Sequence, residues 1–183
     1  MSNDSTSPGW ITPIPDDTPY DEELERILSR WISNVSGLPG KTMYPKWQPK
    51  DKVRPFPAPD TSWCAFGISD LPSTDYPAFI HQTEDGSELS RHEDINCFIS
   101  FYGPSGSANS SLFRDGISIN QNNDELNTYG LSVTSFTRIT PAPEVINSQW
   151  VRRYDMTVSL RRKIIRKYAI KNIVSAEVKF FGE

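Results

Sequence analysis

The last third of the chain alternates apolar with polar residues and contains a dense run of basic side chains. From residue 150 to 161, Met156, Val158 and Leu160 share one face, and a second alternating stretch covers residues 170–180. A period of two residues is typical of strands with one buried and one solvated face. The segment therefore predicts long strands that present positive charge, and it holds no set of residues suited to catalysis.

The basic run, residues 161–167, has three interpretations. It is a patch for phosphates, an exposed hairpin tip or edge strand where cations prevent unwanted pairing, or a salt-bridged contact with a neighbouring subunit. Tyr168 is the only aromatic residue beside it, which weighs against nucleic acid. The candidate basic interface patch consists of Arg152, Arg153, Arg161, Arg162, Lys163, Arg166 and Lys167.

The charge is divided unevenly along the chain. Residues 150–183 contain nine Lys or Arg and three Asp or Glu, a net charge of +6. Residues 1–149 contain ten and twenty, a net charge of −10. An acidic body with a basic end favours head-to-tail contact between copies or contact with an anionic partner.

The 183 residues suffice for one ordinary domain. Residues 1–19 are rich in Pro, Ser, Thr and Asp, which predicts an extended or disordered N-terminal arm before one domain at residues 20–183. Trp10, Ile11 and Ile14 are unusual in a solvated tail, so we take them as a candidate docking arm. The sequence contains no apolar run of membrane-spanning length and no secretory signal, so we expect folding in a cytoplasm.

The spacing of apolar residues predicts an amphipathic helix over residues 21–35, stopped by Gly37. The Pro-rich residues 38–60 form a long loop. Strands are expected at residues 62–69, 78–83, 89–102 and 131–140, the last with a bulge, and a second helix at residues 108–122. The order predicts an α+β fold, a mixed and mainly antiparallel sheet with two helices packed on it.

Chemistry-bearing motifs are missing from the sequence. Cys64 and Cys97 lie in apolar strand-like stretches, so we expect buried free thiols. These cysteines and the two histidines, His81 and His92, lack the short spacing of a zinc site. The acidic pairs, such as Glu93-Asp94, fall at turns and element ends. We expect no enzymatic activity, no cofactor and no metal.

Several segments together are similar to one family. They are Tyr44-Pro45-Lys46-Trp47-Gln48, Trp63-Cys64-Ala65-Phe66-Gly67-Ile68, Cys97-Phe98-Ile99-Ser100-Phe101-Tyr102-Gly103-Pro104, the segment from Trp150 to Val158, and Ala176-Glu177-Val178. In order and character they resemble the neck and tail-terminator proteins of tailed bacteriophages. The resemblance covers residues 20–183 and leaves the N-terminal arm outside.

The resemblance implies a structural virion protein with a tail-terminator-like fold and no catalytic residues. Members assemble as rings, commonly of six copies, that cap the tail tube and join it to the head–neck connector, and viral DNA passes through the lumen. We therefore expect a homo-oligomer in the virion, built in the bacterial cytoplasm, with no membrane partner. The alternative is a nucleic-acid-binding module that uses the basic C-terminal ribbon.

Overall fold

The computed structural model describes residues 3–48 and 53–173. The chain divides into two units, which we call the ribbon unit and the core unit. The ribbon unit comprises Met1–Thr18, Ser73–Glu93 and Lys163–Glu183, and the core unit comprises Pro19–Pro72 and Asp94–Arg162. The division into an arm at residues 1–19 and one domain at residues 20–183 stays a prediction.

The first helix of the core unit, α1 (Asp21–Ser36), forms where the sequence predicts it. Three acidic residues in its first turn complement the positive end of the helix dipole. Its buried stripe follows the helical period and consists of Leu24, Ile27, Leu28, Trp31 and Ile32. Gly37 then adopts the left-handed conformation, with φ of 74°, and ends the helix.

Most strands belong to one sheet, which has seven strands within the described residues and the main order β1-β2-β4-β9-β5. The bounds of these five are Met43–Pro45, Trp63–Asp70, Ser87–Tyr102, Arg153–Tyr168 and Leu131–Phe136. β3 (Ala78–Ile80) pairs with β4, and β6 (Thr140–Pro141) pairs with β9. β7 (Glu144–Ile146) and β8 (Gln149–Val151) form a separate hairpin.

The sheet is mainly antiparallel, and the predicted α+β class is confirmed. β1 runs parallel to β2, whereas β2 with β4, β3 with β4, β5 with β9 and β6 with β9 are antiparallel. Side-chain contacts between β4 and β9 show the same sense. As β4 is followed backward from Asn96 to Asp94, its partner on β9 advances from Ser159 to Arg161.

The helices differ from the prediction in number and length. The second helix, α2 (Gly106–Gly116), ends six residues earlier than expected, and a third, α3 (Asp124–Thr128), follows the 3-10 turn η2 (Asn120–Asn123). Asn122 and Asn123 donate side-chain hydrogen bonds of 2.9 Å to the carbonyls of Gly116 and Ile117. These amides satisfy carbonyls at the end of α2, so the chain turns there instead of continuing the helix.

The strands also depart from the prediction at their ends. The Pro-rich loop contains the 3-10 turn η1 (Gly40–Thr42) and β1, a short edge strand that the Pro content concealed. β3 stops at Ile80, and β5 stops at Phe136 with the predicted irregularity between Val133 and Ser135. Of the second alternating stretch, residues 170–173 form no strand, and residues 174–180 lie outside the described residues.

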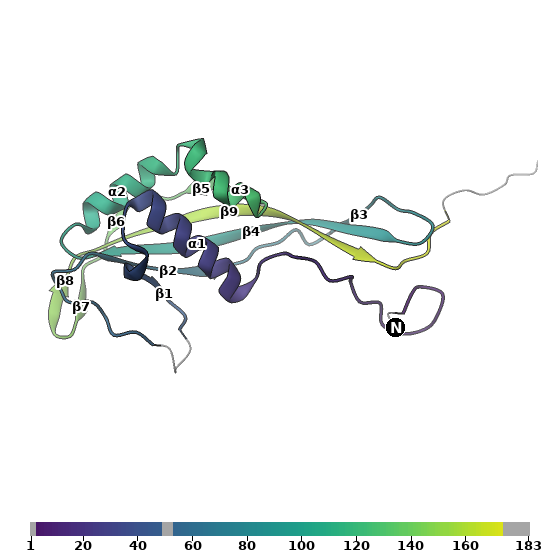
Figure 1. Ribbon diagram of the computed structural model, residues 1–183, viewed down its shortest axis with the longest axis horizontal. Helices are drawn as coiled ribbons and strands as arrows, with labels where there is room; N and C mark the ends of the chain where they lie inside the picture. Colours follow the sequence, from purple (N-terminus) through teal and green to yellow (C-terminus); the bar gives the residue numbers. More distant parts are fainter. Residues whose placement is uncertain (1–2, 49–52, 174–183) are drawn as a thin grey trace, which may run out of the picture. The chain divides into compact units, whose positions relative to one another are not determined.

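The hydrophobic core lies between one face of the sheet and the helices. Alternate residues of β2, β4 and β9 point to this face, where they meet side chains from all three α-helices. Figure 1 shows α1, α2 and α3 on this one side of the sheet. At the centre, the Phe113 ring lies edge-on to Trp31, with centroids 5.1 Å apart, and 5.6 Å from the Phe101 centroid.

We predict that Phe113→Ala lowers the free energy of unfolding by about 3–5 kcal/mol, because it leaves a cavity between α1 and β4. Leu112→Ala is the matched control, since Leu112 is the exposed neighbour on α2 and its truncation should change stability by about 0.5 kcal/mol or less. Urea unfolding followed by tryptophan fluorescence measures both. Equal losses for the two variants would contradict this packing.

Candidate assembly surfaces

The basic run lies within β9, so it is not a hairpin tip and that interpretation is wrong. In the core unit, β9 lies between β4 and β5, and Arg162 pairs with Leu131 at the start of β5. The edge-strand interpretation therefore also fails for residues 161 and 162. The remaining residues of the run, 163–167, belong to the ribbon unit.

Most of the basic side chains with assigned contacts meet carboxylates of the same chain. Arg161 forms a two-pronged contact with Asp94, with Nε–Oδ1 and Nη2–Oδ2 distances of 2.6 and 3.0 Å. Arg153 joins Asp155 at 2.7 Å and Glu144 at 2.9 Å. Within the ribbon unit, the Lys167 ammonium lies 3.5 Å from Glu88. Much of the charge asymmetry is thus neutralised by ion pairs within the chain.

Arg162 is a buried residue rather than a surface cation. Only 3% of it is exposed, its Nη1 donates a 2.5 Å hydrogen bond to the Pro19 carbonyl, and its guanidinium lies 4.5 Å from the centre of the Tyr20 ring. These contacts tie β9 to the segment that leads into α1. The sequence contained a signal for this, because Arg162 falls in phase with the buried Leu160 and Ile164.

Arg152 and Lys163 are the members of the patch that remain exposed without an ion pair in the described part of the chain. Arg166 is half-buried and does have a partner. Six of these seven residues therefore lie on β9 and Arg152 directly precedes it, yet few of their charges are left open. Their role at an interface or a lumen stays a prediction.

The helix-free face of the core unit's sheet carries an aromatic and ionic cluster that the sequence analysis missed. The rings of Trp63 and Tyr102 stack with centroids 4.0 Å apart and planes 3° apart. Burial raises the pKa of Tyr102 well above its usual value, and its hydroxyl donates a 2.9 Å hydrogen bond to Glu144. Val151 and Ile146 of the β7–β8 hairpin pack on the same cluster. This end of the face is therefore covered by the chain's own β7–β8 hairpin.

A groove of about 740 Å³ opens between the start of α1 and the loop after β1. Its apolar walls include Leu24, Met43, Trp47, Ile68 and Leu71, and Arg26 and Arg54 contribute positive charge. Asp21, Glu22 and Glu25 line it near the start of α1. The volume is in the range of sites that hold ligand-sized groups, about 300–1,000 Å³. Trp47 and Leu71 are exposed, so the walls are accessible.

In the ribbon unit, the N-terminal arm is held by backbone contacts with the segment that follows the basic run. The Ile14 N–H donates to the Lys167 carbonyl at 2.8 Å, and the Ser5 N–H donates to the Ala169 carbonyl at 3.2 Å. The predicted docking residues face outward, since Trp10 is 91% and Ile14 is 56% exposed, while Ile11 is half-buried.

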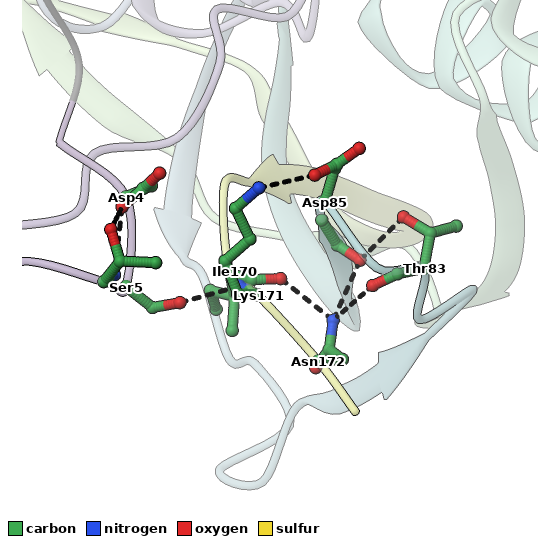
Figure 2. A network of polar contacts seen from close by, with 9 residues as sticks. Asp4, Ser5, Thr83, Asp85, Ile170, Lys171 and Asn172 are labelled. Atoms are coloured by element: carbon green, nitrogen blue, oxygen red, sulfur yellow. Dashed lines mark hydrogen bonds and ion pairs between the residues drawn. The ribbon is translucent and has the colours of Figure 1, made fainter. Parts of the chain in front are cut away.

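A polar network ties this arm to the turn before β4 (Figure 2). The Ser5 hydroxyl accepts a 2.7 Å hydrogen bond from the Lys171 N–H, and the Lys171 ammonium lies 2.5 Å from Asp85. The Asn172 amide lies within 2.8–3.1 Å of acceptors on Thr83, Gly86, Ser87 and Ile170. The sequence offered no periodic signal for these contacts.

The groups capable of chemistry are buried or dispersed. Cys64 and Cys97 are buried free thiols, as predicted. Burial raises the pKa of Cys97 to about 12 and that of Cys64 well above its usual value. His81 is bonded to Glu88 on the surface at 2.7 Å. Among the described residues, no group of three or more His, Cys, Asp and Glu side chains is arranged to hold a metal ion.

Comparison with models of protein families identifies the family of the chain. The family model of phage neck terminator proteins matches residues 22–183, which is most of the chain. The chain belongs to this family. The match includes the core unit from α1 onward and the parts of the ribbon unit built from β3, β4 and β9, and it leaves out the docking arm.

Membership in the neck terminator family defines the general role of the protein. It is a structural component of the phage neck and tail, located in the virion, and it works in contact with other tail and head proteins. No curated protein matches the chain. Among the described helices, none has the length and hydrophobicity needed to cross a bilayer.

We predict that neither thiol of the folded neck terminator protein reacts with a soluble disulfide reagent at pH 8. With a pKa of about 12, the thiolate fraction of Cys97 at that pH is about one in ten thousand, and both side chains are shielded. After unfolding in guanidinium, both cysteines of the sequence should react. A thiol of the folded protein that titrates between pH 8 and 9 would contradict the burial.

We predict different costs for truncating two adjacent arginines of β9. Arg161→Ala should lower the free energy of unfolding by about 1 kcal/mol or less, because its ion pair is partly exposed. Arg162→Ala should cost about 1–3 kcal/mol, because it leaves the buried Pro19 carbonyl without its donor. Thermal and urea unfolding check this order, and a larger loss at Arg161 would argue against it.

Proposed function

We propose that six copies of this chain form a ring that caps the tail tube and joins it to the head–neck connector. The observation that carries the proposal is the family match over residues 22–183, because it covers nearly all of the described fold. In this proposal the subunits are made and assembled in the cytoplasm of a bacterial host, without a membrane partner.

The form of the sheet supports a head-to-tail ring. A closed ring requires two unlike, complementary surfaces on every copy. The two ends of the strand order are unlike, since β1 has three residues and runs parallel to its neighbour, whereas β5 has six and runs antiparallel. β5 contains no charged residue and no proline, so its outer edge lacks two common barriers to pairing with another chain.

Viral DNA passes through the lumen of the proposed ring without sequence-specific binding. The ion pairs of Arg153, Arg161 and Lys167 support this, because cations that are paired with carboxylates release fewer counterions from phosphates. For the same reason the alternative function, a nucleic-acid-binding module that uses the C-terminal ribbon, receives less support. Arg162 adds to this, since its burial removes it from any phosphate-binding surface.

The test combines solution mass with electron microscopy. We expect light scattering of the full-length protein, alone or with purified tail tubes, to give a discrete oligomer, and we expect images to show rings at one end of the tubes. A protein that stays monomeric and never associates with tubes would overturn the proposal. Salt-dependent DNA binding that disappears in Arg152→Ser/Lys163→Ser, with assembly intact, would favour the nucleic-acid-binding alternative.

A further inference from the structure

The N-terminal arm displays large apolar side chains from an ordered backbone. Trp10 is 91% and Ile14 is 56% exposed, although Ile14 and Ser5 are bonded through their backbones to the segment after the basic run. Exposed apolar residues that gather on one segment mark an interaction site more often than a solvated surface. The arm is therefore held in place while two of its apolar side chains have no cover.

Polar contacts anchor the arm to the segment that follows β9, and this segment is itself held by the turn before β4. Figure 2 shows Ser5 joined to Lys171, Lys171 joined to Asp85, and Asn172 directed at the turn that contains Thr83. Because Asn172 has two amide hydrogens and four acceptors within 3.1 Å, the turn before β4 and the Ile170 carbonyl after β9 hold it from several directions. This arrangement lowers the entropy that the arm loses on binding.

The groove of the core unit has the chemistry to receive such a segment. The arm contains Pro8, Pro13, Pro15 and Pro19, which favour an extended backbone, and extended Pro-rich segments bind in grooves lined by aromatic and apolar side chains. Trp47, Met43 and Leu71 supply that lining.

The arm is acidic, and the groove carries side chains of both signs. Residues 1–19 contain Asp4, Asp16 and Asp17 and no Lys or Arg. Arg26 and Arg54 line the groove and are exposed, and in the arm Asp16 and Asp17 follow Ile14 after one proline. Asp21, Glu22 and Glu25 line the α1 side of the groove, so the favourable orientation directs the acidic end of the arm away from them and toward Arg54, whose guanidinium also donates to the carbonyls of Lys41 and Met43.

We infer that the arm of one copy, through Trp10 and Ile14, occupies the α1–β1 groove of the next copy. The inference rests on the proposed ring and names the contact that links its subunits. Arm and groove are unlike surfaces of the same chain, so each copy gives one and receives one, and this is the condition for a head-to-tail ring. Residues 1–21 lie outside the family match, whereas most of the residues that line the groove lie within it.

The test uses two full-length variants that each lack one side of the contact. Trp10→Ala/Ile14→Ala removes the apolar side chains of the arm, and Leu71→Arg blocks the groove. We expect subunit association to weaken about 30-fold in each, the effect of losing about 2 kcal/mol at a central anchor. Mixed together, the two variants should form a one-to-one heterodimer, because one intact arm and one intact groove remain.

Two matched controls guard against unspecific effects. Trp150→Ala removes another exposed tryptophan, 76% exposed on β8, and Leu112→Arg places a charge at an exposed position of α2. Both should assemble like the unchanged protein. Native mass spectrometry and light scattering give the masses, and circular dichroism confirms that every variant is folded.

A cross-linking variant reports the contact directly. Thr12→Cys/Leu71→Cys should give disulfides between copies under mild oxidation, with little background because Cys64 and Cys97 are buried. The inference is overturned if the arm variant forms the same rings as the unchanged protein, or if the mixed variants yield no heterodimer. In both cases the proposed ring still stands, whereas an unchanged protein that remains monomeric and ignores tail tubes overturns the ring itself.

Discussion

The pairing of β4 with β9 is the interaction on which the other elements depend. Each strand has sixteen residues, and each contributes to both units. In the core unit, the alternate residues of the two strands form the floor on which α1, α2 and α3 pack. A shift by one residue would exchange the buried and solvated faces of β9 and would direct Met156 and Val158 to water. The register is therefore tightly constrained wherever helices cover the sheet.

Charged and polar pairs across these strands have more to do with register than with stability. Asp94 meets Arg161, Asn96 meets Ser159, and Glu88 meets Lys167. Partly exposed ion pairs add little free energy, about 0–1 kcal/mol each. A misaligned strand would instead place like charges or unpaired groups opposite one another, so such pairs penalise the wrong alignment. The basic run therefore helps to fix the register of β4 and β9.

Periodicity predicted the elements in which the spacing of apolar residues marks the buried face. The stripe of α1, the Gly37 stop and the alternation of β4 and β9 are local signals, and the structure contains the corresponding elements. β1 was missed, and α3 is a third helix where two were expected, because both depend on distant residues. Pro45 is tolerated at the end of an edge strand, and the end of α2 is decided by side chains of Asn122 and Asn123 that fold back onto it. For Arg162, strand phase was a better guide than residue type.

The burial of both cysteine thiols has a consequence for the stability of the virion over time. A virion leaves the reducing interior of a cell and then persists in aerated water. A protein with accessible thiols would form new disulfides there, and its contacts with neighbouring proteins would change over time. In this chain, Cys64 and Cys97 are sealed inside the sheet, so the neck can keep the same covalent structure from assembly until the next infection.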